Sequence, residues 1–463
     1  MPPSLVLIFW LIFLLLLLRF DHANGPKISP ALWVPVIWMF IAATRLPSQW
    51  LGTQVGIDAA AFQEGNALDR TVSSGLMLLA IVILVSRSFN WTGFFARNVA
   101  LTVFLLFGLA SVFWSDFPLV AVKRWFRDLG GYFVMLVVSS DRRPLEAVGA
   151  LFRRLSYLVI PLSLVIVKYY PQIGRQYDSW TGVATYVGAT TSKNMLGLAC
   201  LVSGLFFFWD TVARWADCRK RQNRRILCVN FVLMAMTAWL LHVSSSATST
   251  VCLVLGCLII TAAHSRTFQR HPALLKVVIL ATLLSYLTII FGFGMGGLAG
   301  AVGRDPTLTD RTKIWAVLLA MNTNPVWGTG YESFWLGRRL LWVWESGVGR
   351  INEAHNGYLQ VYLNLGLIGL LLTSAFLIAS YRTVCRTLRP FSNFGSFSLA
   401  VWIVLLFYNT TEAAFQSGLL WFTLVPGAVV LAAPRVRRVT HPGNLGPLET
   451  PSSVATEATG RWR

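Results

Sequence analysis

An acid and a histidine stand directly before an apolar run near the end of the chain. The stretch NEAHNGYLQVYLNLGLIGLLL covers residues 352–372 and begins with Asn, Glu, Ala and His. An imidazole has an ordinary pKa of about 6.5, so His355 could accept or donate a proton near neutral pH. Glu353, two residues earlier, could orient that imidazole or charge it. These two residues are candidates for acid–base chemistry.

The residues that follow His355 form a polar stripe. Asn356, Gln360 and Asn364 recur every four residues, which places them on one helix face, and Tyr358 lies on a second stripe close by. Polar side chains in a membrane helix face the bundle interior or a water-filled cavity. We therefore expect this stripe to line a cavity below His355. The alternative is that the amides only hydrogen-bond neighbouring helices and the histidine only caps its helix.

Three cationic side chains at expected helix ends could bind an anion. Arg124 and Arg127 in KRWFRDLGG are one helical turn apart, and an arginine fork matches phosphate oxygens. Lys193 in TTSKNMLG stands at the start of an expected helix, whose N-terminus also attracts anions. The alternatives are side chains that reach for the membrane interface and, for Lys193, an ordinary helix cap.

A fourth cation, Arg311, lies in GRDPTLTDRTKIW, where Arg and Lys alternate with Asp. Taken by itself, this segment is typical of a solvated loop with local salt bridges. Its importance depends on what surrounds it.

Long apolar runs must position these groups. The chain has 463 residues, of which 55% are hydrophobic and 13% charged, and its mean hydropathy is +0.61. This balance predicts an all-α polytopic membrane protein of about 12–13 transmembrane helices. The runs fall near 4–18, 30–44, 71–86, 98–114, 126–140, 154–170, 194–212, 226–243, 250–263, 273–299, 356–380, 396–411 and 418–433. The first run lacks a basic segment before it and a cleavage site after it, so we interpret it as a helix and not as a signal peptide.

The net charge of +20 comes largely from basic residues in the loops and does not indicate nucleic-acid binding. Basic residues concentrate in alternate loops, most densely in RWADCRKRQNRR at 214–225. Cytoplasmic loops carry such an excess, so we place these loops and the C-terminus inside. The loop 300–355 then lies outside, in the periplasm or its equivalent, and an odd number of helices places the N-terminus outside as well.

Four regions follow from this topology: membrane helices over 1–299, a large external loop over 300–355, membrane helices over 356–433, and a disordered cytoplasmic tail over 434–463. Within the loop, Ile314, Val317, Leu318 and Met321 recur at helical spacing and predict a short amphipathic helix. The six cysteines match no zinc pattern and suit buried apolar positions. No nucleotide-binding or metal-binding motif is present, so we expect no cofactor and no metal.

Four segments together resemble one known family. The stretch EAHNGYLQVYLNLGLIGLLL resembles the signature of the O-antigen ligase and polymerase superfamily, and TLTDRTKIW with NPVWGTGYESFW resembles the external loop of that family. The segments FWSDFP with KRWFR, and SKNMLG, are similar to its exopolysaccharide polymerase branch. The four segments span roughly residues 110–380 in the family's order. Two positions depart from the pattern: Asp310 replaces a glycine, and Ala247 replaces a residue that is basic in many ligases.

The resemblance implies a glycosyltransferase of the bacterial inner membrane with its active site on the periplasmic side. Such proteins take a glycan from an undecaprenyl-pyrophosphate carrier and pass it to an acceptor hydroxyl, without a metal or a nucleotide sugar. A polymerase extends another lipid-linked repeat unit, and a ligase uses the lipid A core. Other polysaccharide export proteins are possible partners. A transporter or flippase of lipid-linked glycans, or a non-catalytic scaffold, is the alternative outside this class.

The resemblance also suggests roles for the candidate residues. His355, Arg311 and Glu353 become catalytic candidates, with Arg311 stabilising the leaving pyrophosphate. Arg124, Arg127 and Lys193 become candidates for binding the donor pyrophosphate. The remaining candidates, which would line the cavity, are Asn356, Tyr358, Gln360 and Asn364.

Overall fold

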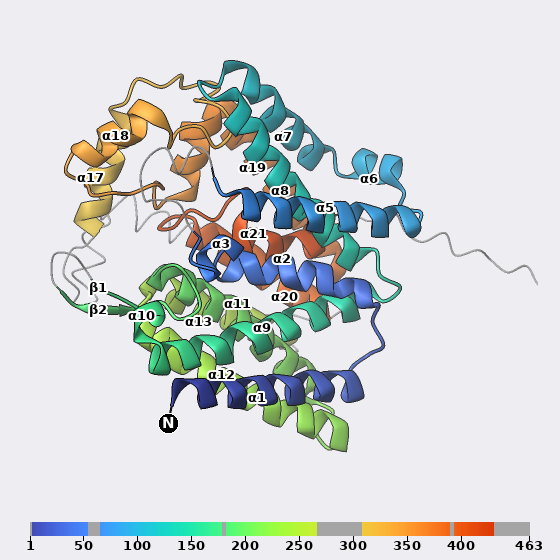
Figure 1. Cartoon of the computed structure of the whole chain (residues 1–463). Helices are drawn as coiled ribbons and strands as arrows, with labels where there is room; N and C mark the ends of the chain where they lie inside the picture. The colour runs from blue at the N-terminus through green and yellow to red at the C-terminus, as the bar shows by residue number, and fades with distance from the viewer. Residues whose placement is uncertain (1, 54–64, 178–181, 266–307, 389–392, 430–463) are drawn as a thin grey trace, which may run out of the picture. The chain divides into compact units, whose positions relative to one another are not determined.

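The computed structural model describes residues 2–53, 65–177, 182–265, 308–388 and 393–429. Helices dominate these residues, and the strands β1 and β2 form a small antiparallel hairpin with Gln176 opposite Thr185 (Figure 1). The elements before the hairpin are α1 (Pro3–Asn24), η1 (Pro30–Leu32), α2 (Trp33–Ala43), α3 (Pro47–Trp50), α5 (Ala67–Ser86), α6 (Trp91–Arg97), α7 (Val99–Ala110), η2 (Ser111–Trp114), α8 (Pro118–Ser139), α9 (Pro144–Tyr169) and α10 (Pro171–Gly174). The remaining elements are β1 (Arg175–Tyr177), β2 (Ala184–Tyr186), α11 (Lys193–Trp215), α12 (Arg221–Ser244), α13 (Ala247–His264), α17 (Leu308–Leu319), α18 (Gly337–Glu345), α19 (Gly357–Leu388), α20 (Asn393–Tyr408) and α21 (Gly418–Ala428).

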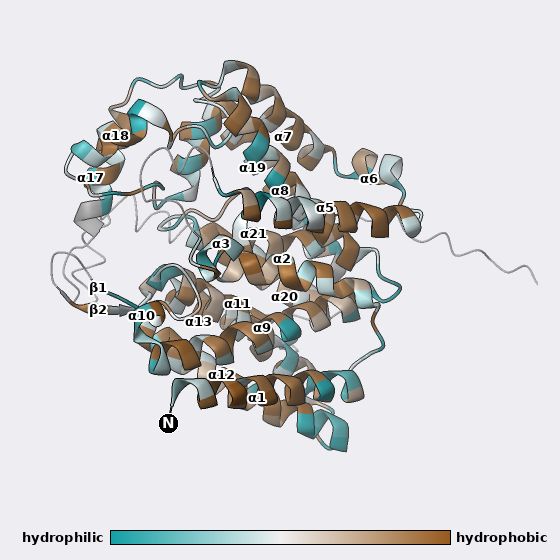
Figure 2. Cartoon of the chain, in the orientation of Figure 1, coloured by the Kyte–Doolittle hydropathy of each residue, from teal (hydrophilic) through white to brown (hydrophobic). Residues whose placement is uncertain are grey.

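The described helices include seven that are long and apolar enough to cross a membrane, or eight if the bent pair α6 and α7–η2 is one span. Long apolar side chains remain exposed on them, for example Leu16 on α1 and Val82 on α5, as expected where lipid is the solvent. Figure 2 shows α1 and α5 as largely hydrophobic ribbons. The predicted fold class, an all-α polytopic membrane protein, is confirmed.

Each predicted apolar run that the structure describes coincides with a helix. The predicted run 273–299 and the predicted tail 434–463 lie outside the described residues. The predicted amphipathic helix in the external loop is α17, whose Ile314 and Leu318 are buried.

Helix α11 lies at the centre of the packing. It contacts α9, α12, α13 and α20, and α1 lies alongside α9 (Figure 1). An aromatic cluster fills the space between these helices, with Phe206, Trp209 and Phe397 in mutual ring contact. Such large buried rings supply much of the packing energy in a core. The frame around α11 therefore holds the ends of several helices in fixed positions.

Polar contacts gather at the two opposite ends of these helices. At one end, here called the Glu412 face, Asn194 bonds to Glu412, and Arg45 donates to the carbonyl oxygens of Ile173 and Thr190. At the other end, here called the Asp210 face, Asp210 bonds to Arg214 and Asn230.

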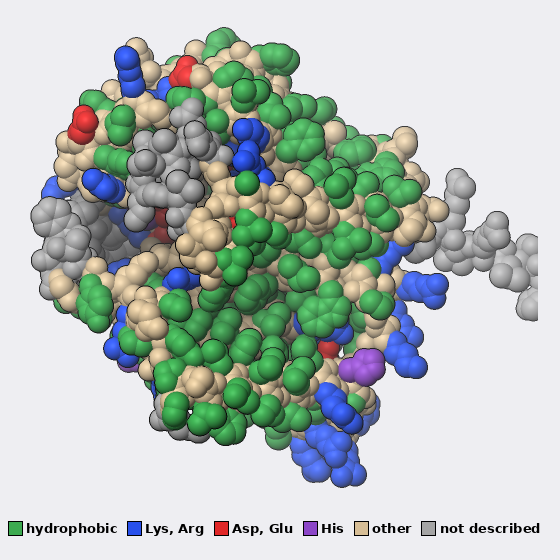
Figure 3. Space-filling view, in the orientation of Figure 1, with side chains coloured by type: hydrophobic (Ala, Val, Ile, Leu, Met, Phe, Trp, Pro, Cys, Tyr) green, Lys and Arg blue, Asp and Glu red, His purple; other side chains and the backbone are tan. Residues whose placement is uncertain are grey.

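The Asp210 face also carries exposed basic residues. Figure 3 shows Lys and Arg side chains gathered at its lower right. The connection between α11 and α12 and the first turns of α12 contribute five exposed cations there: Arg219, Lys220, Arg221, Arg224 and Arg225. The cytoplasmic assignment of that loop, which was made from these charges, stays a prediction.

Helix α19 is broken at Gly366, which has φ 64° and ψ −163°. The turn-rich segment after α17 fits against the break. The amides of Leu367 and Ile368 donate to the carbonyl oxygens of Pro325 and Val326 at 2.9 and 3.0 Å, and Gly330 N–H donates to Asn364 O at 2.8 Å. The segment thus pairs the backbone groups that a broken helix leaves without partners. The break at Gly366 therefore anchors the loop between α17 and α19.

Candidate functional site

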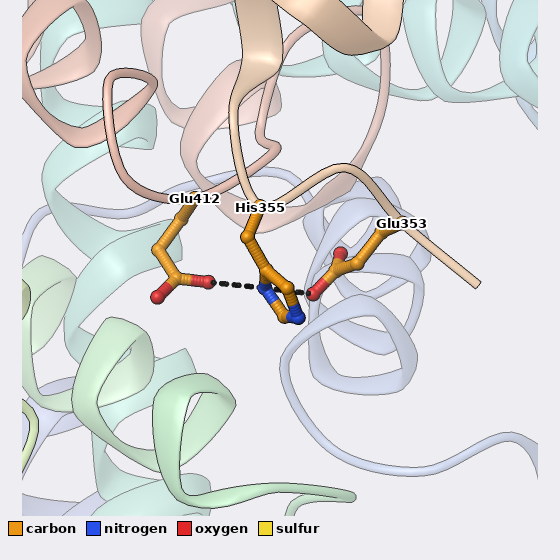
Figure 4. Close-up of side chains that lie close together, drawn as sticks. All are labelled: Glu353, His355 and Glu412. Atoms are coloured by element: carbon orange, nitrogen blue, oxygen red, sulfur yellow. Dashed lines mark hydrogen bonds and ion pairs between the residues drawn. The ribbon is translucent and has the colours of Figure 1, made fainter. Parts of the chain in front are cut away.

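A buried carboxylate, Glu412, lies at the centre of a polar cluster on the Glu412 face. It sits in the connection between α20 and α21, and only 5% of it is exposed. Its Oε1 accepts from Arg311 Nη2 at 2.8 Å and from Asn194 Nδ2 at 2.9 Å. Its Oε2 lies 3.5 Å from His355 Nδ1, and Figure 4 shows this contact. Four distant parts of the chain therefore meet at one carboxyl group.

His355 is held by its backbone as well as by its side chain. Its φ of 46° is in the left-handed region, which is uncommon for a residue other than glycine. On either side, Trp315 Nε1 donates to Ala354 O, and Asn356 Oδ1 accepts from the amides of Tyr358 and Leu359. Asn356 therefore caps the start of α19 and fixes where the histidine projects.

The imidazole of His355 lies between two carboxylates. Its Nδ1 is 3.1 Å from Glu353 Oε1 and 3.5 Å from Glu412 Oε2 (Figure 4). Burial alone would lower the pKa of His355, but the hydrogen bonds and charges of Glu353 and Glu412 outweigh it and raise the pKa to about 9. The ring is therefore cationic at neutral pH, and Nδ1 is the nitrogen that contacts both carboxylates.

Arg311 belongs to the same cluster. Besides Glu412, its guanidinium bonds to the carbonyl oxygen of Thr411, and the hydroxyl of Thr411 bonds to that of Thr248 at 2.9 Å. The side chain of Arg311 remains 22% exposed. The structure thus brings together the three predicted catalytic residues, Arg311, Glu353 and His355, around an acid that joins them.

Lys193 opens α11 beside this cluster. The helix is capped by Ser192, whose Oγ accepts from Met195 N–H at 3.2 Å, and its second residue is Asn194, the partner of Glu412. Lys193 itself is exposed. One predicted anion-binding cation and a positive helix end therefore stand at the cluster.

Arg124 and Arg127 contact another part of the external loop. Arg124 donates to the carbonyl oxygen of Glu332, while Arg127 pairs with Asp128 at 2.9 Å and with Glu332 Oε2 at 3.9 Å. Tyr331 also donates to Asp128 at 3.0 Å. These contacts tie α8 to the turn that precedes α18. Nothing in them joins the two arginines to His355.

The predicted polar stripe on α19 holds the external loop. Gln360 Oε1 accepts from Trp335 Nε1 and from the amide of Ala354, and Asn364 Oδ1 accepts from Phe334 N–H. Asn364 is fully buried, and Tyr358 donates to Leu406 O. Most of these hydrogen bonds run to the loop and one runs to α20, and the cavity-lining role stays a prediction.

A metal ion could in principle sit among the acids. Ligand atoms of Glu353, His355 and Glu412 lie within 4.8 Å of one another. However, Arg311 already bonds to Oε1 of Glu412 at 2.8 Å, so the cluster holds a positive charge of its own next to these three ligand groups. The donor set therefore fits a cationic histidine paired with acids at least as well as it fits a metal.

The sequence reasoning did not identify Glu412 or Asn194 as site residues. Glu412 stands in NTTEAAFQSG, a polar insertion between two apolar runs on the side assigned as external. A single acid in such a short connection is the signal that could have pointed to it. Asn194 stands next to Lys193, which was identified, but its partner lies 218 residues away.

Comparisons with known proteins agree with the resemblance. A family profile described as O-Antigen ligase matches residues 229–374, which include Arg311, Glu353, His355 and the break at Gly366. The chain is 25% identical over 309 residues to the exopolysaccharide production protein ExoQ of Rhizobium meliloti (strain 1021). That alignment covers 62% of this chain and 66% of the relative, slightly less than two thirds of its length. The similarity to the O-antigen ligase and exopolysaccharide polymerase superfamily is confirmed.

Proposed function

We propose that this membrane protein is a glycan polymerase. It would transfer a glycan from an undecaprenyl-pyrophosphate carrier to a hydroxyl of a second lipid-linked unit, building an exopolysaccharide or an O-antigen-type chain. The observation that carries the proposal is the group of Arg311, His355, Glu353 and Glu412 at the ends of membrane helices, where a lipid-linked substrate can reach it. The similarity to ExoQ, an exopolysaccharide production protein, supports the same class of substrate.

The reaction needs positive charge at the leaving group and an acceptor for one proton. The acceptor oxygen attacks the anomeric carbon, the bond from that carbon to the pyrophosphate oxygen breaks, and its electron pair leaves with the pyrophosphate. Arg311, Lys193 and the N-terminus of α11 are preorganised to stabilise that negative charge, so the proposed reaction requires no metal.

The raised pKa of His355 favours Glu353 over His355 as the proton acceptor. A cationic imidazole cannot take a proton, so we assign His355 to hold the acceptor or the pyrophosphate through Nε2–H. Glu353, 41% exposed and 3.1 Å from the ring, then receives the hydroxyl proton. Glu412 is a positioning residue, because its carboxylate contacts both Arg311 and His355.

The proposed setting is the bacterial inner membrane, with the Glu412 face in the periplasm. Undecaprenyl-linked glycans, a glycan acceptor and the bilayer are the expected partners, together with other polysaccharide export proteins. A ligase that uses the lipid A core is the second candidate, since the profile that matches 229–374 is described as O-Antigen ligase. The two activities share a donor and differ in the acceptor.

Reconstitution with a lipid-linked repeat unit tests the proposal. The purified protein in liposomes should convert the unit into longer lipid-linked chains, resolved by gel electrophoresis or mass spectrometry. Transfer only to added lipid A core would identify a ligase. Movement of the lipid across the bilayer without any longer product would identify a flippase and refute the polymerase.

Point variants test the assignment of the site. His355→Ala, Arg311→Ala and Glu412→Gln should each lower the elongation rate by roughly 100-fold or more, because each removes preorganised charge or its support. Arg224→Ala is the control for Arg311→Ala, because it also removes one positive charge, from an exposed position on the Asp210 face. This variant should elongate normally. Normal elongation by both His355→Ala and Arg311→Ala would show that the site lies elsewhere.

A further inference from the structure

The Asp210 face carries a second polar feature, a cationic cavity far along the helices from the Glu412 cluster. Three connections meet there: α1 to α2, α5 to α6, and α8 to α9. The cavity measures about 750 Å³, and its lining includes Lys27, Arg87, Arg142 and Arg143 against one acid, Asp141. The lining therefore has a net charge of +3.

The cations of this cavity differ in how they are held. Arg87 is fixed: its Nη1 donates to Val137 O at 2.8 Å and to Ser140 Oγ at 2.9 Å, and its Nη2 is 3.4 Å from Asp141. Lys27 and Arg142 are exposed, and neither forms an ion pair with any residue that the structure describes. The cavity therefore has a rigid cationic wall and a cationic rim that is open to a ligand.

An apolar surface adjoins the cavity. The last turns of α5, which lead to Arg87, expose Val82 and Val85, each 62% exposed, and α9 begins with the exposed Leu145. Phe89 and Trp91 follow Arg87 and pack edge to face at 4.9 Å, as aromatic residues at a membrane interface do. A ligand in the cavity can therefore have both an anionic head and apolar chains.

We propose that this cavity binds the headgroup of an anionic phospholipid, with its acyl chains along α5. Basic pockets between membrane helices on the cytoplasmic side suit such phosphate headgroups. The chain's own C-terminal segment is a poor occupant, because residues 432–463 contain five arginines and only two acids. A soluble phosphate would satisfy the cations but would leave the adjoining apolar surface unused.

The simpler alternative is that these cations form no specific site and belong to the general excess of positive charge on this face. The chain supplies a matched control, because the first turns of α12 carry the exposed pair Arg224 and Arg225 on the same face, outside the residues that line the cavity. Loss of either pair removes two charges from that face. Only a specific binding site would make loss of Arg142 and Arg143 weaken lipid binding more than loss of Arg224 and Arg225.

Lipid binding to the purified full-length protein tests the proposal. Native mass spectrometry would follow titration with phosphatidylglycerol or with phosphatidylcholine. We expect the wild type to bind phosphatidylglycerol in preference, and the double variant Arg142→Ala/Arg143→Ala to lose affinity by roughly 10- to 30-fold. Among the described residues the guanidinium of Arg143 pairs only with the exposed Glu146, so this variant should remain folded.

Three outcomes would overturn the proposal. The first is an equal loss of affinity in Arg224→Ala/Arg225→Ala, which would reduce the effect to general surface charge. The second is equal binding of phosphatidylcholine. The third is displacement of the lipid by inorganic phosphate at the concentration at which phosphatidylglycerol binds, which would identify a site for free phosphate instead.

Discussion

His355 owes its chemical character to two carboxylates that approach the same ring nitrogen. Glu353 is its neighbour in sequence, whereas Glu412 comes from another connection, 57 residues away. An imidazole in water would be mostly neutral at pH 7, and here it is mostly charged. At the scale of single residues, the site is therefore an arrangement of charges and not only a choice of residue types.

Removing one of these carboxylates should lower the pKa of His355. We expect Glu353→Gln to move the pKa from about 9 towards 6.5, since the hydrogen bond to Glu353 is the largest influence that raises it. NMR titration of the labelled imidazole would measure the change. An unchanged pKa in Glu353→Gln would show that Glu412 alone holds the charge.

The same shift makes folding stability depend on pH. The pKa is higher in the folded state than the ordinary value of 6.5, so the folded state binds the proton more tightly. This stabilisation is fully present below about pH 6.5 and is lost as the pH rises through about 9. Thermal unfolding in detergent should show a loss over that window, and His355→Gln should remove it.

At the scale of elements, the break in α19 positions the external loop. A Cβ on Gly366 would lie 2.3 Å from the backbone of Val326, and the positive φ disfavours any side chain. The segment at 325–330 occupies the space that a continuous helix with side chains would fill. Packing between the helix and the loop therefore requires a glycine at position 366.

A side chain at this break should destabilise the protein. We expect Gly366→Ala to cost at least about 2 kcal/mol, visible as a lower unfolding temperature and as lost elongation. Gly149→Ala in α9 is the matched control: its Cβ would meet nothing within 4 Å, and it should be neutral or slightly stabilising. Equal behaviour of the two variants would refute the role given to the break.

The Asp210 face holds a buried ionic network between helices. Arg153 of α9 contacts Asp21 of α1 at 3.0 Å and Asp210 of α11 at 3.5 Å, and Asn230 of α12 also bonds to Asp210. These side chains are nearly inaccessible, so each depends on its partners to offset the loss of solvation. The network fixes four helices at one end of the bundle.

Loss of one acid from this network should be costly. We expect Asp210→Asn to destabilise the protein by about 3 kcal/mol, because it leaves Arg153 and Arg214 without a common counter-charge. Asp217→Asn removes an exposed partner of Lys220 and should change stability by less than about 1 kcal/mol. Thermal unfolding of both variants in detergent would measure the difference, and equal effects would contradict it.

At the scale of the whole molecule, the described connections alternate between the two faces. The C-terminal end of α1 is on the Asp210 face, where Asp21 meets Arg153 and Arg154. The other end of α1 then lies towards the Glu412 face. With the Glu412 face in the periplasm, as we propose, the N-terminus would lie outside as well, and this stays a prediction.

Cysteine labelling would test this arrangement in cells. In a background without the six native cysteines, Ser4→Cys and Glu345→Cys should react with a membrane-impermeant thiol reagent in intact cells that have a permeable outer membrane. Arg219→Cys should react only after the inner membrane is opened. Labelling of Arg219→Cys in intact cells would invert the topology and would remove the periplasmic site.

Local sequence determined a large part of this protein. Hydrophobic runs predict the helices because burial in lipid depends on composition over about 20 consecutive residues. The spacing of Ile314 and Leu318 predicted α17 in the same way, and His355 and Arg311 stood out through short motifs. These are properties of neighbouring residues, so the sequence alone contains them.

The tertiary structure decided which of these residues meet. Glu412 joins Arg311, which is 101 residues away, and Asn194, which is 218 residues away, because the packing around α11 brings three helix ends and one connection together. The packing of the loop against α19 gave Gln360 and Asn364 indole and backbone partners in the loop. Contacts over such separations depend on how helices pack, and no local pattern specifies them.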